Sequence, residues 1–230
     1  MTGIVKKLYH VAAFGWYAFV VQYLYAKGKE DPPDGIFPYG GPWKYLTFIN
    51  LIVQMVFFGL ASMKDLQPLG KGSKVTLLCL TKDLLFSVFA FPLGLLVVLL
   101  FWGIFTYDRQ LVYPASLDNF FPPWANHAMH TLVLPVLLGE VILEPHIYPK
   151  TRNGLAALGV AGLFYSGWVI WVYVSVGIWV YPLLGRFSTV GLMAFFISNI
   201  FVVIMLYLLG QTLNFRIWGK DHETRAKHKT

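Results

Sequence analysis

The chain has few charged residues and almost no cysteine. Asp, Glu, Lys and Arg make up only 13% of its 230 residues, about half of the share found in soluble globular domains. Cys79 is the single cysteine, which excludes an intramolecular disulfide and a zinc site built on cysteines. The net charge is +7, but no nucleic-acid recognition motif accompanies it, so we do not expect nucleic acid as a partner.

Hydrophobic residues are abundant, at 57% of the chain, and aromatic residues account for 17%. A helix needs about 20 apolar residues to cross a bilayer, and six stretches meet this requirement. Strands of a membrane β-barrel would alternate in polarity, and this pattern is absent. We therefore predict an all-α, polytopic membrane protein with one domain over 1–230 and a lipid-accessible polar pocket. The six predicted spans are 8–26, 45–63, 84–105, 125–143, 156–176 and 188–210.

The distribution of Lys and Arg predicts the orientation. Thirteen of the eighteen lie in the N-terminus, the second and fourth loops and the C-terminal segment, and such an excess marks the cytoplasmic side. Both termini are therefore expected in the cytoplasm. The segment 216–230 is predicted to be a solvated basic tail, with contact to anionic lipid as the alternative. We expect the plasma membrane, the endoplasmic reticulum or both as the location, with membrane lipids as partners.

Two polar residues stand just inside predicted spans, where they are costly to keep dry. Thr47 lies five residues after Pro42, which suits the first turn of a helix, and His130 lies seven residues after Pro123. These separations correspond to about 7.5 Å and about 10.5 Å along a helix axis. Both helices begin on the exoplasmic side in the predicted topology. Thr47 and His130 are therefore expected at the same depth, within one helical turn.

Further polar residues share helix faces with this pair. Asn50 and Gln54 follow Thr47 at helical spacing, and Asn126 precedes His130 by four residues. Each also has a purely structural interpretation. Thr47 can bond to the carbonyl four residues earlier, His130 can be a satisfied interior histidine, and the three amides can join helices.

Chemistry gives the pair a second interpretation. A threonine hydroxyl is a weak nucleophile that needs an adjacent base, and an imidazole is the usual one. Asn126 is a candidate for orienting the ring, and Asn50 or the N–H groups at a helix start are candidates for holding an oxyanion. His127 and His130 also suggest a metal, but this spacing without nearby carboxylates is a weak ligand pattern. No metal or haem site is predicted.

Several segments resemble a known family. They are WKYLTFINL, KDLLFSVFAFPLG, LVYPASLD, WANHAMHTLVLPVLLGEVIL and GIWVYPLLG, and they are similar to the family of androgen-induced and androgen-dependent TFPI-regulating proteins. The resemblance runs over nearly the whole chain. It implies a multi-pass membrane threonine hydrolase of the serine-hydrolase type, which cleaves fatty acid esters of hydroxy fatty acids without a cofactor. It assigns the nucleophile to Thr47 and the general base to His130.

The implied substrate is a lipid ester with one free carboxylate. Lys44 and Arg109, at the predicted exoplasmic rim, are candidates for steering that carboxylate, and surface anchoring is their structural alternative. Two other functions stay open. One is a non-enzymatic membrane scaffold that regulates a coagulation inhibitor, and the other is a lipid transporter, although no repeat or broken-helix signature is seen. The oligomeric state is not predicted.

Overall fold

The long apolar stretches of the sequence form long helices in the computed structural model. The structure describes residues 3–31, 36–67 and 76–227, and side chains as far as Gly219. All regular elements in these ranges are helical. The α-helices are α1 (Gly3–Lys27), α2 (Leu46–Leu66), α3 (Leu77–Leu84), α4 (Phe91–Asp108), α5 (Pro123–His130), α6 (Val133–Leu143), α7 (Thr151–Val176) and α8 (Thr189–Lys227). The short helices are η1 (Gly41–Lys44), η2 (Leu85–Ala90), η3 (Arg109–Leu111), η4 (Ala115–Asp118) and η5 (Pro182–Arg186).

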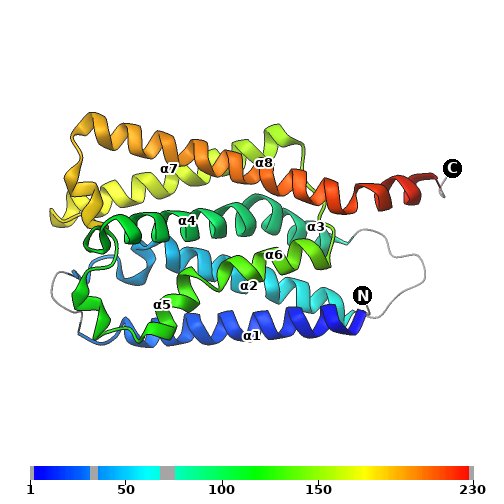
Figure 1. Cartoon of the computed structure of the whole chain (residues 1–230), viewed down its shortest axis with the longest axis horizontal. Helices are drawn as coiled ribbons and strands as arrows, with labels where there is room; N and C mark the ends of the chain where they lie inside the picture. The colour runs from blue at the N-terminus through cyan, green and yellow to red at the C-terminus, as the bar shows by residue number, and fades with distance from the viewer. Residues whose placement is uncertain (1–2, 32–35, 68–75, 228–230) are drawn as a thin grey trace.

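The helices form one elongated bundle, with both described ends of the chain at the same end of it (Figure 1). In the described ranges, five helical segments are long and apolar enough to cross a membrane. They are Leu46–Leu66, Leu77–Leu111, Pro123–Leu143, Thr151–Val176 and Thr189–Gly219. The helix α1 is long enough but less apolar, because it contains several tyrosines, His10 and Gln22. It packs along α2 over the bundle's length (Figure 1). The protein is an integral membrane protein, and the sixth span over 8–26 stays a prediction.

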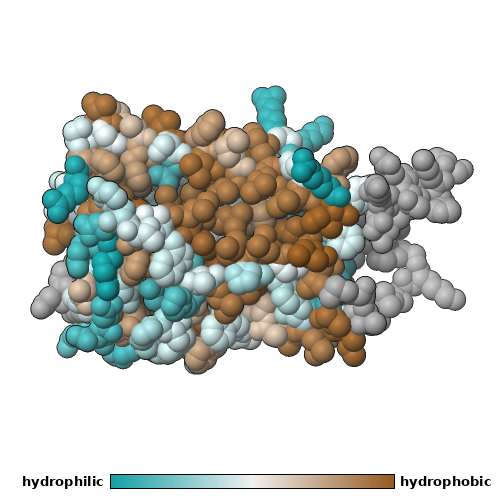
Figure 2. All heavy atoms as spheres, viewed as in Figure 1, coloured by the Kyte–Doolittle hydropathy of each residue, from teal (hydrophilic) through white to brown (hydrophobic). Residues whose placement is uncertain are grey.

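The outer surface of the bundle is suited to lipid. Figure 2 shows hydrophobic side chains across the middle of one face and hydrophilic ones gathered toward one end. On α7 and α8, only 17% of the apolar window of each helix is buried. Large side chains such as Phe164 and Phe201 are exposed there. An apolar surface of this extent is stable only against hydrocarbon, which agrees with an integral membrane protein.

The third predicted span differs from the observed helix at its start. The helix begins at Leu77, seven residues before the predicted 84, and passes through the π-helical turn η2 before α4. Pro92 explains the irregular turn. Its ring has no N–H and collides with the carbonyl four residues earlier, so the backbone widens locally rather than continuing as a regular α-helix.

The fourth predicted span, 125–143, is interrupted. The helix α5 ends at His130, Thr131 and Leu132 form a turn, and α6 starts at Val133. The carbonyl of His127 accepts hydrogen bonds from both turn residues, each at 2.9 Å. Pro135 is the cause, because its ring excludes a regular helical position for the Thr131 carbonyl. The break places His130 at a helix end rather than within a helix.

The last two spans begin or end outside the predicted limits. The helix α7 starts at Thr151, five residues before the predicted 156. The helix α8 does not end near 210 but continues to Lys227, so most of the predicted tail 216–230 is helical. Residues 228–230, as well as Lys71 and Lys74 of the second loop, lie outside the described residues.

The core of the bundle lies where α1, α2, α4 and α6 meet. Its fully buried members include Tyr17, Leu51, Phe58, Phe91 and Leu137. The rings of Tyr17 and Phe58 stack at 5.7 Å and join α1 to α2. Gly94 allows close approach of α4 to α6, since a Cβ there would lie 2.5 Å from Leu137 Cδ1. This packing holds α2 and α6 against α4, and α5 makes its own contacts with α4.

Candidate active site

Thr47 is the second residue of α2, and hydrogen bonds from α7 and the following loop hold this helix start in place. The backbone N–H of Leu46 donates to Tyr181 Oη at 2.9 Å. Tyr165 Oη lies 3.1 Å from the Lys44 carbonyl and 3.0 Å from Tyr181 Oη. Because a carbonyl only accepts, the proton of Tyr165 points to Lys44 and Tyr181 donates to Tyr165. The first turn of α2 is therefore tied to two tyrosines distant in sequence.

The structure brings Thr47 and His130 into direct contact. Thr47 Oγ1 lies 3.2 Å from His130 Nε2. The Trp43 carbonyl, which was the alternative partner of this hydroxyl, accepts a hydrogen bond from Trp168 Nε1 at 3.3 Å instead. A hydroxyl at hydrogen-bond distance from an imidazole nitrogen has the geometry required for a nucleophile and its base.

The other ring nitrogen of His130 defines the tautomer. Nδ1 lies 2.7 Å from Asn126 Oδ1 and 3.1 Å from the backbone carbonyl of Asn126. A carbonyl oxygen cannot donate, so Nδ1 carries the proton. The backbone carbonyl makes this assignment independent of the way the Asn126 amide is turned. Nε2 therefore presents a lone pair to Thr47, which can accept the hydroxyl proton.

Aromatic packing fixes the plane of the His130 ring. The ring lies on Phe101 with centroids 3.5 Å apart and an interplanar angle of 5°. Trp102 Nε1 donates to the His130 carbonyl at 3.1 Å, and this carbonyl is available because α5 ends there. His130 is 5% exposed. Its ring is thus held between α4, Asn126 and Thr47 with little freedom to rotate.

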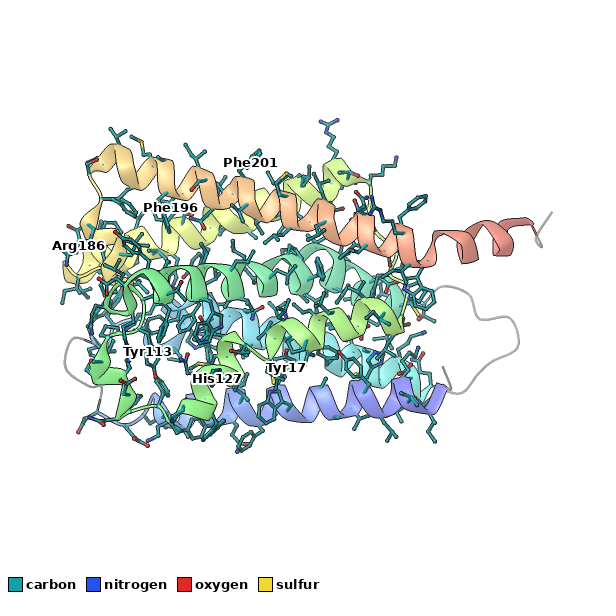
Figure 3. All side chains as sticks on the ribbon, in the orientation of Figure 1. Tyr17, Tyr113, His127, Arg186, Phe196 and Phe201 are labelled. Carbon is teal, nitrogen blue, oxygen red and sulfur yellow. The ribbon has the colours of Figure 1, made fainter. Side chains whose placement is uncertain are left out.

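Thr47 lies in the wall of a cavity of about 270 Å³. The cavity is lined from α2, α4, α7 and α8, and nearly all of the lining is apolar. Its polar members are Thr47, Tyr165, Ser166, Tyr181 and Asn199. Figure 3 labels Phe196, a lining residue on α8, and His127 on α5, with α4 between these helices in this view. The hydroxyl thus has the base on one side and an apolar space on the other.

The predicted polar pocket is not confirmed, because Asn50 and Gln54 do not line this cavity. Both are fully buried within the bundle. Gln54 Nε2 donates to Asn50 Oδ1 at 3.1 Å and to the Ala90 carbonyl at 2.8 Å. Among the described residues, Asn50 Nδ2 has no hydrogen-bond partner. Gln54 therefore joins α2 to η2, whereas Asn50 keeps an unused donor one turn from Thr47.

Lys44 and Arg109 do not line the cavity either. Lys44 is 1% exposed, and its ammonium donates to the carbonyls of Phe37 and Tyr39. Burial lowers the pKa of Lys44 to about 8. Arg109 pairs with Asp118 at 2.6 Å. Both cations thus have partners within the protein, and their predicted steering role stays a prediction.

His127 is separate from the Thr47–His130 pair. Its Nδ1 lies 3.0 Å from Thr131 Oγ1, on the side of α5 that packs on Trp102. The two histidines therefore do not converge on one point, although they are three residues apart. Tyr165, Tyr181 and Phe101 are the site residues that the sequence did not single out. They belong to aromatic-rich spans in which spacing alone does not distinguish them from packing residues.

The chain matches known proteins over nearly its whole length. The sequence profile of the FAR-17a/AIG1-like protein family matches residues 5–215. The androgen-dependent TFPI-regulating protein of Homo sapiens is 40% identical over 230 residues, covering 100% of both chains. The protein of the same name from Rattus norvegicus is 42% identical over 228 residues, covering 99% of both chains.

A second kind of relative matches a shorter region. The androgen-induced gene 1 protein of Homo sapiens is 44% identical over 188 residues, covering 78% of this chain and 79% of its own. No solved structure matches the chain.

Proposed function

This chain belongs to the FAR-17a/AIG1-like protein family, and we propose that it is an intramembrane hydrolase of fatty acid esters of hydroxy fatty acids. Thr47 is the nucleophile and His130 is the general base in this proposal. The observation that carries it is the 3.2 Å contact between Thr47 Oγ1 and His130 Nε2 in the wall of an apolar cavity. An interior packing threonine would need neither the oriented base nor the cavity.

The proposed reaction has two steps. In the first, Thr47 Oγ attacks the ester carbonyl while Nε2 of His130 takes the hydroxyl proton. The tetrahedral intermediate collapses, the ester C–O bond breaks, and the hydroxy fatty acid leaves with the proton from Nε2. In the second step, His130 takes a proton from water, the resulting hydroxide attacks the acyl-threonine, and Nε2 returns the proton to Thr47. The fatty acid is then released.

The start of α2 provides a place for the developing negative charge. The backbone N–H of Thr47 is one of the four at the helix start that lack an intrahelical acceptor, and the helix dipole favours an anion there. Asn50 Nδ2 also lacks a partner among the described residues, but Asn50 does not line the cavity, so it is proposed only to support the start of α2. An oriented donor such as the Thr47 N–H typically contributes about 3–4 kcal/mol to transition-state stabilisation.

The cavity determines which substrates fit the proposal. Its almost wholly apolar lining accepts an alkyl chain and offers no ion-pairing group to the free carboxylate. The carboxylate end of the substrate therefore stays toward the rim of the membrane. Lys44 and Arg109 are proposed to act only on this approach, because neither lines the cavity.

The test is hydrolysis of a fatty acid ester of a hydroxy fatty acid by the purified full chain. His130→Ala should lower kcat by about 10²–10⁴-fold, the range for general acid–base catalysis. Thr47→Ala, which removes the nucleophile, should lower kcat at least as much, whereas Thr47→Ser should keep activity because it keeps the hydroxyl. His127→Ala is the matched control, since this histidine lies on the same helix without contacting Thr47, and it should leave the rate unchanged.

The result also decides between the proposal and a regulatory scaffold. The relatives' name, androgen-dependent TFPI-regulating protein, describes regulation rather than chemistry. A monodisperse parent protein without hydrolysis would support the scaffold. Full activity in folded Thr47→Ala protein would show that another residue is the nucleophile.

A further inference from the structure

A second group of polar side chains lies at the opposite end of the bundle from Thr47. The N-terminal turns of α1, the short helix α3 and the C-terminal ends of α2 and α6 meet there (Figure 1). The proposed hydrolysis uses none of these groups, yet His10 and Glu140 are 0% exposed and His146 is 2% exposed. The group, which we call the ion cluster, consists of Lys6 and His10 of α1, Lys64 and Asp65 of α2, Lys82 and Asp83 of α3, Glu140 of α6, and Glu144 and His146 beyond it.

Each histidine of the ion cluster lies between two carboxylates. His10 Nδ1 is 2.7 Å from Asp65 Oδ2, and its Nε2 is 2.9 Å from Glu140 Oε2. His146 Nδ1 is 3.0 Å from Asp83 Oδ1, and its Nε2 is 3.0 Å from Glu140 Oε1. In each ring, Nδ1 contacts an aspartate, Asp65 for His10 and Asp83 for His146, and Nε2 contacts Glu140.

These contacts need more positive charge than neutral rings supply. A neutral imidazole has one N–H, and an ionised carboxylate only accepts. With two neutral rings, two of the four contacts bring a nitrogen lone pair against a carboxylate oxygen. The four carboxylates also outnumber the lysines. Lys6 and Lys82 lie within 3.3 Å of carboxylate oxygens, and Lys64 reaches Glu144 only at 3.8 Å from the exposed rim.

We propose that the ion cluster binds one divalent transition-metal ion between Nε2 of His10 and the carboxylates of Glu140 and Glu144, whose ligand atoms lie within 4.8 Å of one another. Metal-binding histidines usually donate their other ring N–H to a carboxylate, and Asp65 occupies that position for His10, with Oδ2 at 2.7 Å from Nδ1. His146 lies beside this group rather than in it, because its Nε2 is 3.0 Å from Oε1 of Glu140 and orients that carboxylate.

Nitrogen and oxygen donors without sulfur identify the class of ion as zinc or iron(II). The sequence does not indicate this site, because the only histidine spacing in it that suggests a metal is that of His127 and His130. The ion would tie α1, α6 and the segment after α6 together, with α2 and α3 held through Asp65 and Asp83. Its role is structural and is independent of the proposed hydrolysis.

The test is the metal content of the full chain, purified without chelator and measured by mass spectrometry. We expect about one zinc or iron ion per chain. Removal of metal with EDTA should lower the midpoint of thermal unfolding, and Zn²⁺ added back should restore it. Glu140→Gln keeps the shape of the side chain but removes its charge, and this variant should lose the metal. His10→Ala should lose it as well. His127→Ala should keep it, because that histidine lies outside the cluster.

X-ray absorption at the metal edge of the wild-type protein makes the test independent of how the variants fold. One imidazole nitrogen at about 2.0–2.1 Å from the ion is expected. The proposal is overturned by a metal bound without imidazole. It is equally overturned if the monodisperse protein neither contains nor takes up zinc or iron(II), in which case two imidazolium rings complete the cluster.

Discussion

The orientation of His130 by Asn126 gives the most direct quantitative prediction. Asn126→Ala removes the Oδ1 acceptor at 2.7 Å from Nδ1 but leaves the backbone carbonyl at 3.1 Å. The ring should therefore keep its tautomer and its stacking on Phe101. The Nδ1–H group then has one hydrogen-bond acceptor instead of two. The helix α5 should tolerate the change, because alanine is a better helix former than asparagine.

The size of the effect follows from the loss of one of two acceptors. A hydrogen bond between neutral groups contributes about 0.5–1.5 kcal/mol, which corresponds to a decrease in kcat of about twofold to tenfold. The hydrogen bond strengthens when the ring becomes an imidazolium, so the loss should fall on kcat and leave KM nearly unchanged. A decrease of a thousandfold would mean that Asn126 contacts the reacting atoms itself.

The assay is steady-state hydrolysis by Asn126→Ala, Thr47→Ala and the double variant, with thermal unfolding as the folding control. Residues that act as one unit are non-additive. The double variant should therefore be no slower than Thr47→Ala alone. Multiplied losses, or a rise in KM with unchanged kcat in Asn126→Ala, would refute an orienting role through His130.

Three other predictions concern the surroundings of the site. Tyr181→Phe removes the acceptor of the Leu46 N–H and should lower the free energy of unfolding by about 1–3 kcal/mol, measured by denaturant or thermal unfolding; no loss would show that water replaces the hydroxyl. Gly94→Ala should destabilise by about 1–3 kcal/mol through overpacking, whereas Gly103→Ala on the same helix, with nothing within 4 Å, should not. Because burial lowers the pKa of Lys44 to about 8, the folded state releases this proton first, so stability should increase as the pH rises from about 8 to about 10; a flat pH dependence there would contradict it.

The sequence predicted the helical class and five of the membrane-crossing segments well, because apolar runs of this length have few alternatives. It also predicted that Thr47 and His130 lie at the same depth. Prolines explain two errors. Pro92 and Pro135 stand inside predicted spans, and their effects on η2 and on the turn after His130 were visible in principle.

The remaining features depend on contacts between distant segments. Thr47, Asn50 and Gln54 share a helical face in the sequence, but only packing shows that Thr47 reaches a cavity and the two amides do not. The ion cluster joins residues as far apart as His10 and Glu140, and no spacing rule connects them.

The turn at Thr131 and Leu132 makes the two halves of one membrane crossing independent modules. In a continuous helix, inserting one residue after His130 would rotate everything beyond it by about 100°. Here the base takes its position from α4 and Asn126, upstream of the turn, while Glu140 takes its position from α1 and His146. Changes in length or sequence within α6 can therefore move Glu140 within the ion cluster while the contact between His130 and Thr47 stays the same.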